Sequence, residues 1–116
     1  MTDQATFRLR AHKGIPVIEV TGELDISNIE EFRSFLREAL LPDSKAVIFD
    51  LEHISYFDSH GLQAIVELSQ RLNTMRRQLL VVSRRETPPG KLLRSAHLDL
   101  ALKLFETIDE AVLSLS

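Results

Sequence analysis

Hydrophobic and polar positions in the first quarter of the chain follow a period of two, which is typical of half-buried strands. Residues 7–11 alternate apolar and polar side chains, and residues 16–21 form a run rich in β-branched side chains. Gly14 lies between these runs, so the pattern predicts a β-hairpin. Gly22 is expected to end the second strand, and residues 23–25 are expected to form a short acidic loop.

Three later segments have the spacing of amphipathic helices. Residues 27–30 and 107–110 each fit a capping box, in which Ser or Thr is followed three residues later by Glu. A third helix is expected to begin near Asp58 or Ser59, and either residue is a suitable N-cap. Pro42 is expected to stop the first helix. The predicted inward positions are Ile29, Phe32, Phe35, Leu36, Ala39 and Leu40, then Leu62, Ile65, Val66, Ser69 and Leu72, and finally Ile108, Ala111, Val112 and Leu115.

Short apolar runs between these helices predict three more strands, at residues 46–51, 78–83 and 102–105. The first two are apolar almost throughout, as expected for strands that are covered on both faces. Residues 52–57 are expected to form a bend, and residues 84–90 a turn-rich loop.

A further short helix is predicted at residues 91–95, with Leu92 and Leu93 facing inward. Strands that alternate with helices imply crossover connections and a mainly parallel sheet, to which the opening hairpin adds an antiparallel pair. No interdomain linker or internal repeat is present, so residues 1–116 are expected to form one domain. The predicted fold is a single α/β domain with a mixed, mainly parallel sheet of four to five strands and about four helices.

Composition narrows the function classes. Of the 116 residues, 44% are hydrophobic and 27% are charged, which favours a globular domain over a disordered chain. Cysteine is absent, which excludes disulfides and thiolate chemistry. No apolar run approaches the ~18 residues of a membrane helix, and the polar start lacks a signal-peptide core. A cytoplasmic protein without membrane insertion is therefore expected.

Charge is unevenly distributed, although the net charge is only −3. Residues 71–94 contain seven basic side chains and one acidic one, whereas residues 19–31 contain five acidic side chains and no basic one. Both stretches are consistent with solvated faces or with two electrostatically distinct contact surfaces. A nucleic-acid partner is not expected, because no aromatic residue interleaves the basic stretch and no binding motif is present.

Ser59 is the candidate for chemistry. In open α/β sheets functional groups gather beyond the carboxyl ends of the strands, where helices begin, and Ser59 follows the run at 46–51. A helix N-terminus favours an anion, so a phosphate on Ser59, with about −1.5 to −2 charges, would be tolerated locally. The alternative is that Ser59 is only a helix cap, and local sequence alone favours this alternative, because Ser is common at helix starts.

An enzyme is not expected. Asp58, Ser59 and His60 contain the residue types of a hydrolytic triad, but adjacent side chains at a helix start diverge, and no Gly-x-Ser-x-Gly elbow is present. The histidines lack metal-ligand spacing, and no phosphate-binding glycine loop or dinucleotide motif occurs. No metal and no cofactor are therefore predicted.

Two motifs give the chain a family resemblance. Residues 50–62 read Asp-Leu-Glu-His-Ile-Ser-Tyr-Phe-Asp-Ser-His-Gly-Leu. This run resembles the signature of the STAS family, the anti-sigma factor antagonists, with Ser59 at the position of the phosphorylated serine. Residues 21–26 resemble the family's Gly-Glu-(Leu or Ile)-Asp loop, and residues 98–115 resemble its last strand and helix.

The resemblance implies a partner switch in transcription regulation, for example in a stress response. The unphosphorylated protein would bind an anti-sigma factor with serine kinase activity, phosphorylation of Ser59 would release it, and a serine phosphatase would reset it. The ATP and metal of this cycle would belong to the partners, and the protein itself is expected to be a monomer or weak dimer. The implied docking residues are Glu23, Leu24, Asp25, Asp58, Ser59, His60, Gly61 and Leu62.

Two positions depart from the family pattern. His60 replaces a small residue, and its imidazole is expected either to narrow the choice of kinase or to prevent phosphorylation. His97 stands where the family often has Gly, which suits a left-handed helix cap better. The alternative function is a binding module that never turns over phosphate, either the scaffold of a stress complex or the small subunit of a lipid-transport assembly.

Overall fold

A β-hairpin opens the chain, as the alternating pattern predicts. The computed structural model describes residues 5–39, 44–95, 98 and 101–115. In it, β1 (Thr6–His12) pairs antiparallel with β2 (Ile15–Leu24). Lys13 and Gly14 form the turn with φ of 51° and 80°, the left-handed values that a tight hairpin turn requires.

The second strand does not end at Gly22, contrary to the sequence prediction. β2 continues to Leu24, and the register with its parallel neighbour shifts between Gly22 and Glu23. Gly22 has a φ of 91°, a backbone conformation that residues with a side chain rarely adopt. The glycine therefore marks a bulge within the strand instead of its end, and the acidic loop begins later.

Parallel strands extend the sheet from β2. β3 (Ala46–Asp50), β5 (Gln78–Val82) and β6 (Lys103–Phe105) follow in the order β1-β2-β3-β5-β6. β4 (Ile54–Phe57) lies off this path and pairs in parallel with the distal end of β2. The predicted class, an α/β domain with a mixed and mainly parallel sheet, is confirmed, and the described residues form six strands where four or five were expected.

Sequence reasoning took the segment that contains β4 for a bend. The strand has four residues, and its central Ser55 and Tyr56 are both exposed between buried ends. Such a segment has no alternating pattern. It becomes a strand only because the end of β2, far away in the sequence, supplies its hydrogen-bonding partner.

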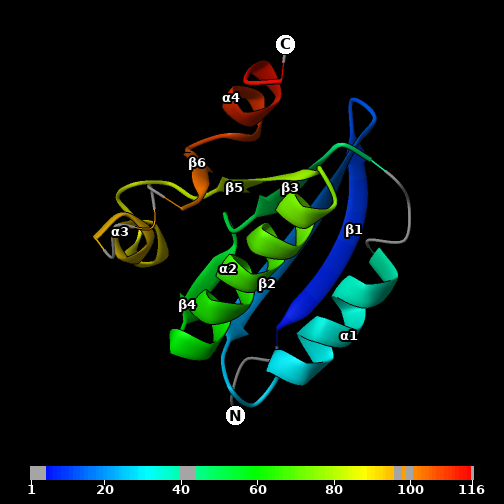
Figure 1. Cartoon of the computed structure of the whole chain (residues 1–116). Helices are drawn as coiled ribbons and strands as arrows, with labels where there is room; N and C mark the ends of the chain where they lie inside the picture. The colour runs from blue at the N-terminus through cyan, green and yellow to red at the C-terminus, as the bar shows by residue number, and fades with distance from the viewer. Residues whose placement is uncertain (1–4, 40–43, 96–97, 99–100, 116) are drawn as a thin grey trace.

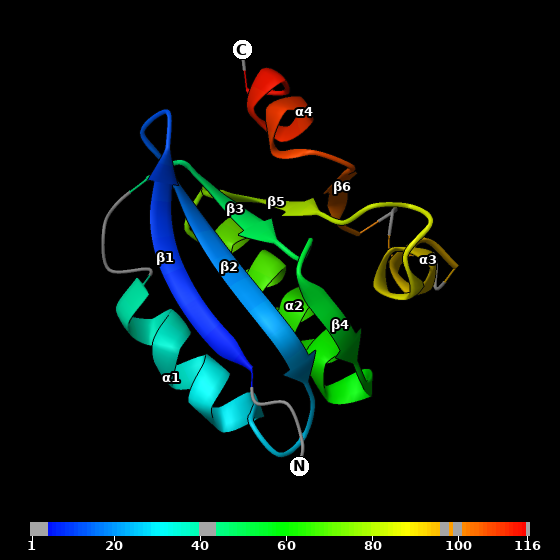
Figure 2. The same ribbon diagram turned by 180° about the vertical axis from the view of Figure 1, so that it is seen from behind.

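Helices cover both faces of the sheet. α1 (Ile29–Ala39) and α2 (Ser59–Thr74) lie together on one face (Figures 1 and 2), where they enclose the larger core. α3 (Pro88–Ser95) packs beside β4. α4 (Ile108–Leu113) covers part of the opposite face, with Ala111 completely buried.

The larger core, with the partly buried residues packed against it, contains most of the positions that the periodicity predicts for α1 and α2. Of all the predicted helix positions, the fully or almost fully buried ones are Ile29, Phe32, Leu36, Ala39, Ile65, Ser69, Leu72 and Ala111. Phe32 packs against Phe7 and Phe49, with ring centroids 5.3 and 5.6 Å apart. Leu40, Pro42 and His97, on which parts of the prediction depended, lie outside the described residues.

The prediction of a capping box at residues 27–30 is wrong. The Ser27 hydroxyl donates to the Asp25 carboxylate, and the Ser27 amide donates to the same oxygen. The first helical hydrogen bond instead runs from the Phe32 amide to the Asn28 carbonyl, at 3.0 Å. Ser27 bonds Asp25 instead of capping the helix, because Asp25 lies two residues before it and their bond closes an Asx turn.

The two helices near the C-terminus agree with the sequence in part. α3 begins at Pro88, three residues before the predicted start, and Leu93 is buried whereas Leu92 is 38% exposed. Proline is well suited to the first turn of a helix, because that turn leaves its amides unpaired. Thr107 caps α4 as predicted, accepting from the Glu110 amide at 3.1 Å, although the Glu110 carboxylate bonds the amide of the residue before the cap.

Candidate functional site

The start of α2 and the end of β2 meet at one end of the sheet, the lower end in Figures 1 and 2. Leu24 is paired with Phe57 in the β2–β4 register, and the Asp58 amide donates to the Leu24 carbonyl at 3.2 Å. Residues 23–25 therefore lie beside Ser59 in space, although about 35 residues separate them in the sequence.

Asp58 is the N-cap of α2. Its backbone is extended, with φ of −96° and ψ of −170°, and its Oδ1 accepts from the amides of His60 at 2.9 Å and Gly61 at 3.1 Å. Its Oδ2 accepts from the Ile26 amide at 3.3 Å. One carboxylate therefore holds both the helix start and the loop after β2, and it leaves Ser59 as the first residue of the helix.

The environment of Asp58 favours its charged form. Partial removal from water works against the charge, but hydrogen bonds from the amides of Gly61, His60 and Ile26 outweigh this effect and hold the pKa of the Asp58 carboxyl below its ordinary value. The imidazole Nδ1 of His60 lies 3.5 Å from Asp58 Oδ2, and the His60 side chain is 48% exposed.

Ser59 is exposed at the first position of α2. Its hydroxyl takes part in no hydrogen bond with any residue that the structure describes, and the first turn of α2 contains no acidic side chain. The hydroxyl is therefore accessible to another molecule, at a helix end whose unpaired amides and dipole favour a negative charge.

Asn28 fixes the loop between β2 and α1. Its side-chain amide donates to the Glu23 carbonyl at 2.7 Å, and its side-chain oxygen accepts from the Asp25 amide at 3.0 Å. These bonds close the loop on itself and leave Ile26 65% exposed at its tip. The sequence analysis placed Asn28 in a capping box and Ile26 in the loop of the family resemblance, but it gave neither residue a role at the site. Two features of the sequence could have pointed to them, namely an Asn in a turn and a single apolar residue in a polar loop.

Gly61 and Leu24 contribute through position. Leu24 is fully buried, and Gly61 lies so close to it that an added Cβ would be 2.9 Å from the Leu24 carbonyl oxygen and 3.0 Å from Phe57 Cβ. The absence of a side chain at Gly61 allows the first turn of α2 to approach β2. Leu62 is half-buried. The exposed side chains among the eight predicted residues are therefore Ser59 and His60, with Glu23, Asp25 and Asp58 half-buried.

A small apolar hollow lies beside this site, between β4 and α3. It has a volume of about 130 Å³. Tyr56, 51% exposed, and Leu92, 38% exposed, line it together with Pro88 and Pro89. Sequence reasoning missed this surface because it depends on β4, which was not predicted. Exposed aromatic and aliphatic side chains next to a charged cluster are typical of a protein contact surface.

Asp50, the first residue of the resemblance motif, has a structural place. It is 1% exposed, its Oδ1 accepts from the Glu52 amide at 3.0 Å, and Arg10 Nη2 lies 3.4 Å from its Oδ2. Burial raises the pKa of the Asp50 carboxyl, and the Glu52 amide and Arg10 oppose that rise. Asp50 therefore shapes the turn that leads from β3 into β4.

The arrangement does not form a hydrolytic triad in the part of the chain that the structure describes. The His60 ring lies against Asp58, but the Ser59 hydroxyl bonds neither of them. Within the same described ranges, no three His, Asp or Glu side chains gather as a metal site would require. No described helix combines the length and the apolar character needed to cross a membrane.

These features define a class: a small α/β domain that presents an exposed serine at a helix start beside a rigid, partly apolar loop. The STAS domain model matches residues 6–111. The chain therefore belongs to the STAS domain family.

Individual relatives agree with this membership. The chain is 22% identical over 110 residues to the anti-sigma-F factor antagonist RsfB of Mycobacterium tuberculosis, covering 95% of this chain and 88% of RsfB. The crystal structure of an anti-sigma factor antagonist from Mycobacterium paratuberculosis superposes with a TM-score of 0.86 at 21% identity, covering 98% of this chain and 97% of that one. The phosphorylated form of the Bacillus cell fate determinant SpoIIAA gives a TM-score of 0.65 at 21% identity, covering 96% and 100% of the two chains.

Proposed function

We propose that this protein is an anti-sigma factor antagonist controlled by phosphorylation of Ser59. In its unphosphorylated form it binds an anti-sigma factor that has serine kinase activity. Phosphorylation of Ser59 ends the complex, and a serine phosphatase restores the binding form. The protein acts as a binding partner and substrate in this cycle, not as an enzyme.

The observation that carries the proposal is the division of roles at the start of α2. Asp58 supplies the cap, so the exposed Ser59 hydroxyl is not needed to hold the helix. The relatives named RsfB and the Mycobacterium paratuberculosis protein are anti-sigma factor antagonists, and SpoIIAA exists in a phosphorylated form. A phosphate on Ser59 would meet the positive end of the helix dipole and would leave the fold intact.

The partner surface consists of three neighbouring parts. Ser59 and His60 supply its centre, and the loop with Glu23, Asp25 and Ile26 supplies one side. The hollow lined by Tyr56 and Leu92 supplies the other side. A phosphate at the centre would add charge and bulk where the partner must approach, which explains release without a change of fold.

Phosphorylation is tested by mixing the protein with ATP and the candidate anti-sigma factor kinase, followed by intact-mass analysis. We expect a gain of one phosphate, which the variant Ser59→Ala loses. Ser55→Ala is the matched control, because Ser55 is also exposed nearby but its hydroxyl donates to the Gly22 carbonyl. Modification of Ser59→Ala to the same extent as the natural chain would contradict the assignment.

Release is tested separately with Ser59→Asp. We expect affinity for the kinase to fall at least about tenfold, because a charge enters the centre of the contact surface. The melting temperature should change little, and Ser34→Asp, which adds the same charge on the outer side of α1, should leave affinity unchanged. A stable complex that forms without any phosphate transfer would instead favour the non-switching binding module, with His60 as the residue that prevents transfer.

A further inference from the structure

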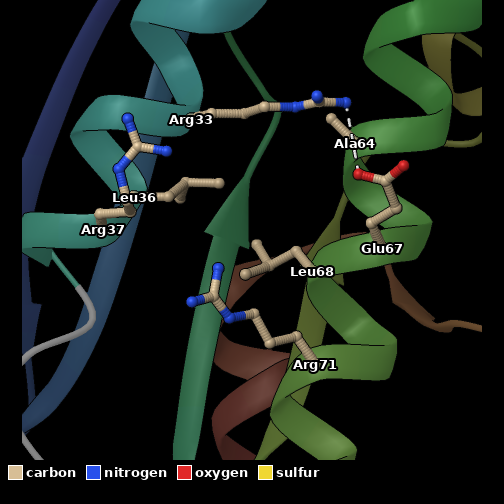
Figure 3. A pocket seen from close by; sticks show the side chains of 7 residues that line it. All are labelled: Arg33, Leu36, Arg37, Ala64, Glu67, Leu68 and Arg71. Atoms are coloured by element: carbon tan, nitrogen blue, oxygen red, sulfur yellow. Dashed lines mark hydrogen bonds and ion pairs between the residues drawn. The ribbon is translucent and has the colours of Figure 1, made fainter.

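The fold divides the basic stretch at residues 71–94 among different surroundings. Arg77 is buried and donates to the Ser44 carbonyl, and Arg84 forms an ion pair with Glu52 at 3.6 Å. Arg71 instead lies on α2 and lines a groove of about 190 Å³ between α1 and α2 (Figure 3). This groove is separate from the Ser59 site.

The floor of the groove is apolar. Leu36 points from α1 toward α2, and Leu68 points back from α2 (Figure 3). Ala64, one turn before Leu68, adds a small side chain that keeps the groove open. The floor can therefore accept an apolar group but offers it no hydrogen bond.

The rim of the groove is positively charged. Arg33 reaches across from α1, with its Nη2 3.3 Å from Glu67 Oε2, while its Nε is buried and has no acceptor in the described part of the chain. The guanidinium groups of Arg37 and Arg71 form no ion pair or hydrogen bond with any described residue. Two guanidinium groups thus border an apolar floor, and neither pairs with a carboxylate of the described residues, since Glu67, which also lines the groove, pairs with Arg33.

Helix dipoles account for only part of this pattern. Arg37 and Arg71 lie in the last turns of α1 and α2, where a cation is favourable. That effect requires a cation near each helix end, on any side of the helix. It does not require both arginines, and Arg33 as well, to line the same hollow.

We propose that this groove is a second docking site, which binds an acidic helical segment of a protein partner. An apolar side chain of the segment rests on Leu36 and Leu68, and neighbouring carboxylates pair with Arg37 and Arg71. Guanidinium groups bind carboxylates in two-pronged geometry, and a groove between two helices suits a third helix.

The size of the groove favours a side chain over a small molecule. Sites for drug-sized ligands are usually about 300–1,000 Å³, whereas a volume of about 190 Å³ fits one or two inserted side chains. Such insertion of a single anchor with charged neighbours is typical of protein interfaces.

The proposed site is distinct from the surface at Ser59. Ser59 is the first residue of α2 and Arg71 lies twelve residues further, a distance of about 18 Å along the helix. Occupation of the groove therefore neither requires an unphosphorylated Ser59 nor blocks access to it. The inference does not depend on the proposed function.

The test is an NMR titration of the ¹⁵N-labelled full chain with a synthetic helical peptide. The peptide carries one central Leu, with Glu three and four residues before and after it on an Ala-rich background. We expect shift changes centred on residues 33–37 and 64–71, with a dissociation constant on the order of 1 mM or tighter. Affinity should fall as salt is added, since the rim is exposed to solvent.

Matched variants distinguish docking in the groove from a general effect of the net charge of the protein. Arg37→Glu with Arg71→Glu should weaken binding at least about tenfold, whereas Arg8→Glu with Lys91→Glu, an equal charge change elsewhere, should not. If the first pair unfolds the chain, Arg37→Gln with Arg71→Gln provides the same comparison. The Ser59→Asp variant should bind the peptide as the natural chain does.

Several results would overturn the proposal. These are unchanged affinity in both groove variants, equal binding of a peptide with Gln in place of Glu, and no shift changes at millimolar peptide. Tighter binding of hexyl phosphate, or of vesicles containing phosphatidylglycerol, at the same residues would assign the groove to a small anion or to a lipid surface.

Discussion

At the residue scale, Asp58 rather than Ser59 holds the local structure. Its carboxylate accepts hydrogen bonds from three backbone amides. Those of His60 and Gly61 lie in the first turn of α2, and that of Ile26 lies 32 residues before Asp58 in the sequence. The sequence could not distinguish the two residues as caps, because Asp and Ser cap helices about equally well. Tertiary contact decided between them, since only Asp58 also faces the Ile26 amide.

Asp58→Ala is expected to lower the free energy of unfolding by about 1–2 kcal/mol, since it removes an N-cap and frees the Ile26 amide. Asn caps helices well, so Asp58→Asn should lower the free energy of unfolding by less than Asp58→Ala does. Urea unfolding at neutral pH measures both. Asp109→Asn, at an exposed aspartate away from the site, should stay within about 0.5 kcal/mol of the natural chain.

The pH dependence has a definite sign. The pKa of Asp58 is lower in the folded chain than its ordinary value near 3.8, so its stabilising effect is fully present above that value. The effect is lost as the pH falls through the folded pKa. The stability difference between the natural chain and Asp58→Asn should therefore be largest near neutral pH and shrink in acid. A difference that grows as the pH falls would contradict the role assigned to Asp58.

At the element scale, the strongly periodic segments were predictable and the context-dependent ones were not. The hairpin, the strands near residues 46 and 78 and the stripe of α2 follow from local pattern. β4 was missed because its four residues need the end of β2 as a partner. The bulge at Gly22 was taken for a strand end, since glycine is typical of both.

Gly61 determines how closely α2 approaches β2, so Gly61→Ala should be destabilising despite the better helix propensity of alanine. The added Cβ would meet a backbone oxygen at 2.9 Å, and we expect a net loss of about 1–2 kcal/mol in urea unfolding. Gly90→Ala should cost more, because its Cβ would overlap the Arg84 carbonyl. Equal or greater stability of Gly61→Ala would show that α2 can shift without cost.

At the scale of the whole molecule, the two faces of the sheet differ in how they are covered. One carries α1, α2 and the larger core, and the other is covered in part by α4 through Ala111 and its apolar neighbours. The overall class followed from the order of strands and helices. The surfaces did not, because the groove between α1 and α2 and the hollow beside β4 each combine segments distant in sequence.

The contribution of α4 can be measured with two substitutions. Ala111→Glu places a charge at a fully buried position against Val17 and Ile48, and should cost several kcal/mol or prevent folding. Leu113→Ser, at a position 71% exposed on the same helix, should change the free energy of unfolding by less than about 1 kcal/mol. Similar effects of the two would mean that α4 does not stabilise the sheet.

The hydrogen bond from the Ile26 amide to Asp58 links the loop tip to the residue next to Ser59. A phosphate on Ser59 would change the electric field at Asp58, and the amide resonance of Ile26 should move with it. The protein therefore contains its own spectroscopic reporter, on a different segment from the modified residue. The Ile26 amide cross-peak would then report the fraction of molecules phosphorylated at Ser59, in real time and without a label on any partner.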